Sequence, residues 1–191
     1  MVVWTSGKAA RLLPIILILC WCLPEGVGAN GFQLNIVDAQ RIEDVYYLDA
    51  EVDYVLSADV REALFNGVPL EFELEAEVIR LRRWLWNETV LATSRRYLLR
   101  YRVLAKHYQV VDLSSGEKAY FKTLSRALQT LGQVKRWPII QVDQLVHKEL
   151  YQIKVRCRLD VDALPLPLQP TSLFSSAWKL ASDWSVWRLN Y

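Results

Sequence analysis

Hydrophobic and polar residues alternate one by one over most of the chain beyond residue 30, a pattern typical of half-buried β-strands. The clearest run covers 151–159, where apolar residues at odd positions alternate with polar residues at even positions. Cys157 falls on the apolar side of this run, so we expect it to pack in the core. The alternation predicts strands over 32–37, 46–54, 70–78, 97–103, 108–113, 119–121, 137–142 and 151–159.

Two short segments have helical periodicity instead. In 57–66 the apolar positions 60, 63 and 64 follow Ser57, a suitable N-cap, and precede Gly67. In 123–131 the positions 124, 127, 128 and 131 fit one helix face, and Gly132 ends the segment. Segment 164–170 contains three prolines, so we expect an extended connector there. The tail 178–184 fits either a strand or a helix, and we favour the strand.

These elements predict an all-β fold, mainly antiparallel, in the form of a β-sandwich with one or two short helices. A closed β-barrel is the alternative. The apolar parity changes between Val78 and Ile79, which indicates a β-bulge or a strand that passes from one sheet to the other.

The first 29 residues have the order of a secretory signal peptide. Lys8 and Arg11 precede an apolar run over 12–23, and small residues follow at 27–29. The run is shorter than the roughly 20 residues that span a bilayer as a helix. We therefore expect cleavage between Ala29 and Asn30, with 30–191 as a single domain. An uncleaved N-terminal anchor in the inner membrane is the alternative, and it would be the protein's only membrane contact.

Composition and motifs argue against several functions. The formal net charge is only +2 at pH 7, so nothing in it requires a nucleic-acid partner. The chain has two histidines and seven glycines. It has no hydrolase nucleophile motif, no zinc-ligand spacing and no glycine-rich phosphate loop. We expect no catalytic residue, metal or cofactor, and we expect that the protein is not an enzyme.

One segment concentrates arginine and tryptophan, the residue types that dominate the energetics of many interfaces. Arg80, Arg82, Arg83, Trp84 and Trp86 lie in seven consecutive positions, just before a turn expected at 87–89. We expect the partner strand to offer these arginines no carboxylate, which makes the segment a candidate interaction surface. The simpler interpretation is that the tryptophans close the core and that charges on neighbouring strands pair with one another.

Five motifs in order resemble the bacterial exported family called domain of unknown function 4390. They are 63–72 (ALFNGVPLEF), 80–86, 97–101, 159–168 and the closing Trp178-x-Leu180-x-Ser182-x-Trp184-x-x-Trp187. The resemblance implies an uncharacterised protein of the Gram-negative periplasm. It further implies a membrane sensor kinase, or another envelope protein, as a partner, and it carries no catalytic residues.

Two functions follow as hypotheses. The first is a non-catalytic protein-interaction module, which would be an accessory to that sensor kinase. The second is a carrier that holds an apolar ligand or lipid between its sheets, which requires an apolar cavity of some hundreds of cubic ångströms.

Overall fold

A computed structural model describes residues 31–165 and 175–189. The expected signal peptide and most of the proline-rich connector lie outside these residues. The strands are β1 (Gln33–Ile42), β2 (Val45–Asp53), β3 (Leu70–Leu81), β4 (Glu88–Arg102), β5 (His107–Asp112), β6 (Lys118–Phe121), β7 (Gln133–Gln141), β8 (Leu150–Asp160) and β9 (Ser185–Leu189). The helices are α1 (Ala58–Phe65), α2 (Leu124–Leu131) and two short 3-10 helices, η1 (Val142–Gln144) and η2 (Ser176–Trp178).

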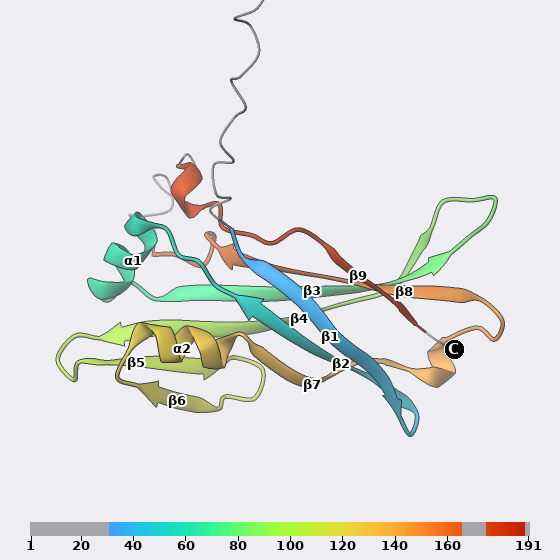
Figure 1. The fold of residues 1–191 in the computed structure, drawn as a ribbon, viewed down its shortest axis with the longest axis horizontal. Coiled ribbons are helices and arrows are strands. Elements are labelled where there is room, and N and C mark those ends of the chain that lie inside the picture. The colour runs from blue at the N-terminus through green and yellow to red at the C-terminus, as the bar shows by residue number, and fades with distance from the viewer. Residues whose placement is uncertain (1–30, 166–174, 190–191) are drawn as a thin grey trace, which may run out of the picture.

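The strands form two open antiparallel sheets, so the sandwich prediction is confirmed and the barrel alternative is wrong. One sheet has the order β1-β2-β7, and the other has the order β6-β5-β4-β3-β8-β9. In Figure 1 the three-stranded sheet lies across the six-stranded one, with its strands inclined to those behind. The core consists of the alternating apolar residues of both sheets, which are buried as predicted along β2 and β8.

An aromatic cluster joins the two sheets near one end of the core. Phe32, Tyr54 and Phe72 approach one another with ring centroids 4.9–5.8 Å apart, two of the pairs edge to face. Such geometry adds about 0.5–1.5 kcal/mol per pair beyond the burial of area. The cluster fixes the start of β1 and the end of β2 over the beginning of β3.

Both predicted helices are present, with the caps that the sequence indicates. The Ser57 hydroxyl accepts a hydrogen bond from the Val60 amide, and Gly67 follows α1 with a left-handed φ of 89°. The Thr123 hydroxyl caps α2 in the same way, and Gly132 ends it. A cap of this kind contributes about 1 kcal/mol. These helices therefore begin and end for local reasons.

The parity change in β3 marks a bulge and not a change of sheet. Val78 pairs with Leu91 and Ile79 with Thr89, so Val90 is an extra residue on β4. The pairing of β3 with β8 continues through this point without a shift. The prediction of a bulge is thus confirmed, and the bulge lies on the partner strand.

Two details of the predicted strands are wrong. Val103, expected to face inward, lies beyond the end of β4 and is 53 % exposed. The tail forms neither the favoured strand nor the helix over 178–184. Instead, η2 ends at Trp178, Ala181 makes a single bridge to Arg158, and β9 begins only at Ser185. Trp178 and Leu180 are buried there, and the Leu180 carbonyl accepts a single hydrogen bond from the Leu159 amide of β8 at 2.8 Å instead of forming a regular ladder.

Candidate interaction site

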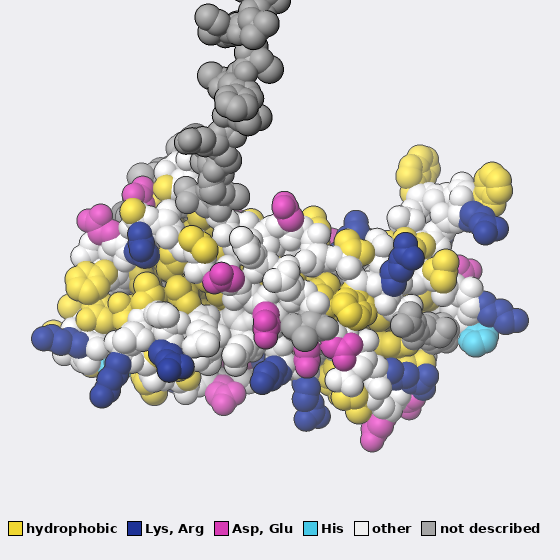
Figure 2. Space-filling view, viewed as in Figure 1, with side chains coloured by type: hydrophobic (Ala, Val, Ile, Leu, Met, Phe, Trp, Pro, Cys, Tyr) yellow, Lys and Arg dark blue, Asp and Glu magenta, His cyan; other side chains and the backbone are white. Residues whose placement is uncertain are grey.

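The hairpin between β3 and β4 ends in a loop that projects from the body of the protein. We call the residues Arg82, Arg83, Trp84, Leu85 and Trp86 of this loop the Arg/Trp tip. Figure 1 shows the loop extending beyond the sheets, and Figure 2 shows hydrophobic side chains gathered at the end of a projection, with basic side chains beside them. The turn falls at 82–87 and not at the predicted 87–89, because Glu88 already belongs to β4.

The tryptophans of the tip are almost completely exposed. Trp84 is 91 % and Trp86 92 % exposed, with Leu85 between them at 66 %, whereas Trp137 and Trp178 are buried in the core. The interpretation of the tryptophans as core residues is therefore confirmed for the latter pair and wrong for the former. A cluster of large, exposed apolar side chains is more informative than any single one, because such clusters mark sites of interaction.

The arginines near the tip are partly neutralised, contrary to expectation. Because of the bulge, Glu88 lies opposite Arg80 in the ladder. Its carboxylate accepts hydrogen bonds from Arg80 and also from Arg82. The hydrogen bond from Arg80 is the main reason that the pKa of Glu88 lies below its ordinary value. Arg83 has no ion-pair partner among the described residues.

Hydrogen bonds therefore hold the base of the tip, whereas the side chains at its end are exposed. The Asn87 side chain accepts a hydrogen bond from the Arg82 amide at 3.3 Å, and Arg80 is mostly shielded from solvent. All five predicted site residues lie at the same end of one hairpin, but they have two different roles. Arg80 and Arg82 hold the hairpin closed, whereas Arg83, Trp84 and Trp86 face solvent.

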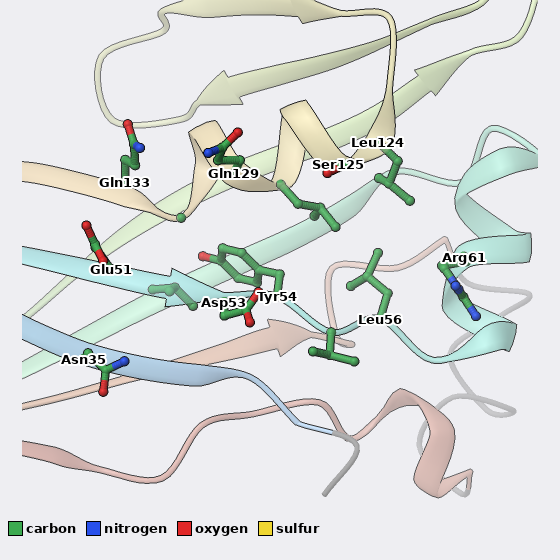
Figure 3. A pocket seen from close by; sticks show the side chains of 14 residues that line it. Asn35, Glu51, Asp53, Tyr54, Leu56, Arg61, Leu124, Ser125, Gln129 and Gln133 are labelled. Carbon is green, nitrogen blue, oxygen red and sulfur yellow. The ribbon is translucent and has the colours of Figure 1, made fainter. Parts of the chain in front are cut away.

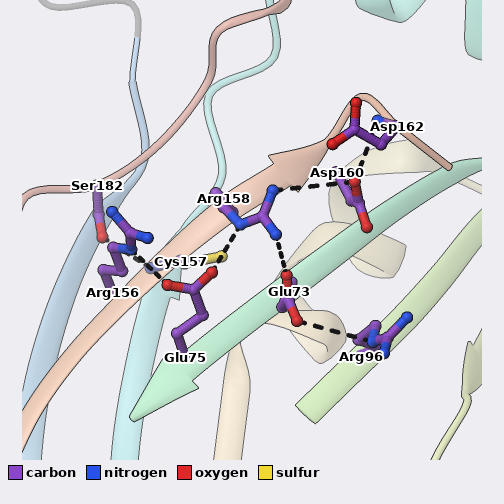
Figure 4. A network of polar contacts seen from close by, with 9 residues as sticks. All are labelled: Glu73, Glu75, Arg96, Arg156, Cys157, Arg158, Asp160, Asp162 and Ser182. Atoms are coloured by element: carbon purple, nitrogen blue, oxygen red, sulfur yellow. Dashed lines mark hydrogen bonds and ion pairs between the residues drawn. The ribbon is translucent and has the colours of Figure 1, made fainter. Parts of the chain in front are cut away.

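The other charged rows form a structural network on the outer face of the larger sheet (Figure 4). Glu75 accepts hydrogen bonds from Arg156 and Arg158, at 2.6 and 2.7 Å, and Glu73 lies between Arg158 and Arg96. Glu73 and Glu75 of β3 thus pair with both neighbouring strands, and mainly with β8. The interpretation of the charged rows as cross-strand pairs is confirmed for these two glutamates.

Cys157 also has a structural role. It is buried, and its thiol donates a hydrogen bond to the Tyr54 hydroxyl at 3.4 Å. Burial raises the pKa of the thiol to about 12, so the nucleophilic thiolate is absent at neutral pH. The position on the apolar face of β8 was predicted from the alternation.

A cavity that the sequence did not predict lies between α2 and the end of β2. We call it the α2 groove. It is open to solvent, has a volume of about 770 Å³, and has both apolar and polar walls. Figure 3 shows Leu124, Ser125 and Gln129 of α2 on one side, with Asp53, Tyr54 and Leu56 on the other. An open groove of mixed polarity at the edge of the fold gives the lipid-carrier hypothesis no specific support.

The described residues contain no group of three or more His, Cys, Asp or Glu side chains placed to hold a metal ion. Within the same part of the chain, no helix is long and apolar enough to cross a membrane.

Fold and site together define a two-sheet antiparallel β domain with a projecting Arg/Trp hairpin. Residues 29–188 match the family model described as a domain of unknown function, DUF4390, and the chain belongs to this family. No curated protein and no solved structure matches the chain significantly.

Proposed function

We propose that this protein is a non-catalytic interaction module of the cell envelope, which docks onto another envelope protein through the Arg/Trp tip. The observation that supports the proposal is the exposure of Trp84 and Trp86 on a hairpin whose base is held by ion pairs and a side-chain hydrogen bond. Export through a cleaved signal peptide and residence in the periplasm belong to the same proposal. The family resemblance makes a membrane sensor kinase the first partner to test.

The energetics favour a reversible contact. A tryptophan buries about 200 Å² at an interface, which at about 25 cal/mol/Å² gives about 5 kcal/mol per residue before costs. Association costs at least about 4 kcal/mol in lost translational and rotational freedom. The two tryptophans alone therefore support a weak complex, and Arg83 adds electrostatic attraction to an acidic partner surface. That attraction should weaken as salt rises, because exposed charges are screened over about 10 Å at 0.1 M.

The test compares two variants in a pull-down from envelope extract of the producing cells. In W84S/W86S the exposed side chains of the tip are removed. The matched control is F65S/L104S, which removes two exposed hydrophobic side chains, 59 % and 102 % exposed, in α1 and in the β4–β5 turn. We expect the tip variant to lose its protein partner and the control to retain it, with both variants folded by circular dichroism.

Retention of the same partners by W84S/W86S would refute the proposal. The proposal of a protein partner would also be wrong if the unaltered protein retained no protein partner but co-sedimented, through the tip, with vesicles of anionic phospholipid. In that case the tip contacts a membrane surface.

A further inference from the structure

The α2 groove exists because one edge of β2 loses its strand partner. β2 pairs with β7 as far as Glu51 and Gln133. One residue further, the Val52 amide still donates to the Gly132 carbonyl at 2.9 Å. The chain on that side is then α2 and not a strand, so the β2 edge beyond Val52 borders a helix.

The chain beyond Val52 keeps the character of a strand. Burial continues to alternate, with Tyr54 and Leu56 buried and Val55 exposed. Strand β2 ends at Asp53. Because backbone groups of alternate residues in an extended chain point to the same side, we expect the amides of Tyr54 and Leu56 on the side that the Val52 amide takes. Neither of these two amides has a hydrogen-bond partner among the described residues. The groove is therefore bordered by a short, unpaired strand edge.

The walls of the groove add side-chain complementarity. Leu124 and Leu128 of α2 form an apolar surface opposite this edge. Glu51 and Asp53 also line the groove, and both are exposed carboxylates without an ion pair in the described part of the chain. A ligand that pairs with the backbone can place an apolar side chain against the leucines and a basic side chain against the carboxylates.

We propose that the α2 groove receives an extended peptide segment of a protein partner, by strand addition along Tyr54 and Leu56, with a basic side chain against Glu51 and Asp53. In strand addition the main-chain hydrogen bonds supply affinity and alternate side chains supply specificity. The volume of about 770 Å³ lies within the usual range for ligand sites, about 300–1,000 Å³. This site is separate from the Arg/Trp tip and does not depend on the function proposed for it.

The experiment selects a phage-displayed library of random dodecapeptides on the full-length protein. We expect enrichment of peptides in which lysine or arginine alternates with apolar residues. Their affinity should fall at least tenfold in E51K/D53K, which reverses the carboxylate charges. It should be unchanged in D143K/E149K, a matched reversal of two exposed carboxylates outside the groove, and in the tip variant W84S/W86S.

Two further measurements distinguish strand addition from simple charge attraction. S125W places a large side chain in the groove and should abolish peptide binding. If S125W fails to fold, Q129W, which lies one turn further along α2, serves as the blocking variant in its place. Hydrogen exchange at the amides of Tyr54 and Leu56 should slow at least tenfold when a selected peptide binds. The proposal is wrong if no peptide is enriched, if the folded tryptophan variant binds as well as the original, or if both amides exchange at an unchanged rate.

Discussion

The ion-pair network around Glu73 makes a sharp prediction for E73Q. The Glu73 side chain is only 11 % exposed, and its carboxylate accepts a charge-assisted hydrogen bond from Arg158 and lies 3.7 Å from the Arg96 Nε. A hydrogen bond to a charged group contributes about 1.5–3 kcal/mol. The Arg96 pair contributes less than about 1 kcal/mol, because that arginine is more than half exposed. Glutamine keeps an acceptor oxygen but loses the charge, so we expect a loss of about 2 kcal/mol.

Urea unfolding followed by tryptophan fluorescence measures this loss. With a slope of about 2 kcal/mol per molar urea, the midpoint of E73Q should fall by about 1 M. E77Q is the matched control, because Glu77 lies on the same strand and face but has no ion pair within the described residues. Its midpoint should move by less than about 0.25 M, as for ordinary surface changes. Equal midpoints for the two variants would refute the account of the network.

Three other sites give independent tests. G132A should cost about 1–3 kcal/mol in thermal unfolding, because an added Cβ would lie 2.1 Å from the Val52 carbonyl oxygen; an unchanged Tm would contradict this packing. Burial raises the pKa of Glu75, but hydrogen bonds from two arginines outweigh burial and lower it overall. Glu75 therefore contributes stability above its unfolded pKa of about 4.3, and this stability is lost as pH falls through the folded pKa. E75Q should show a flatter decline in stability below about pH 4, and an identical acid profile would count against the pairs. The Cys157 thiol should react with a thiol reagent such as DTNB only as fast as the protein unfolds; rapid reaction in the native state would disprove its burial.

Local signals predicted much of the fold. The strict alternation in β8 and β2 and the caps of both helices depend on neighbouring residues only, and each was correct. The predicted position of the hairpin turn was wrong because β3 ends at Leu81 and β4 already begins at Glu88. The extra residue Val90 also shifts the register of the hairpin by one. That shift brings Glu88 opposite Arg80, a contact that no local pattern contains.

The sequence composition predicted which residues form the candidate site, but it did not predict that their side chains are exposed. In the sequence, Trp84 and Trp86 cannot be distinguished from the other tryptophans. Only the packing of the sheets determines which tryptophans are exposed and which are buried. The α2 groove was missed for a similar reason. It arises from where α2 lies relative to the end of β2, and this arrangement depends on tertiary contacts such as the approach of Gly132 to Val52.

Site-specific photo-crosslinking in the producing cells shows whether the Arg/Trp tip contacts an envelope protein. A photoreactive amino acid is placed at Trp84 of the Arg/Trp tip or, as the control, at Leu104, which is fully exposed in the β4–β5 turn. We expect a covalent adduct with an envelope protein from position 84, reduced when Arg83 and Trp86 are also replaced, and no such adduct from position 104. An adduct from position 104 alone, or no protein adduct from either position, would contradict it.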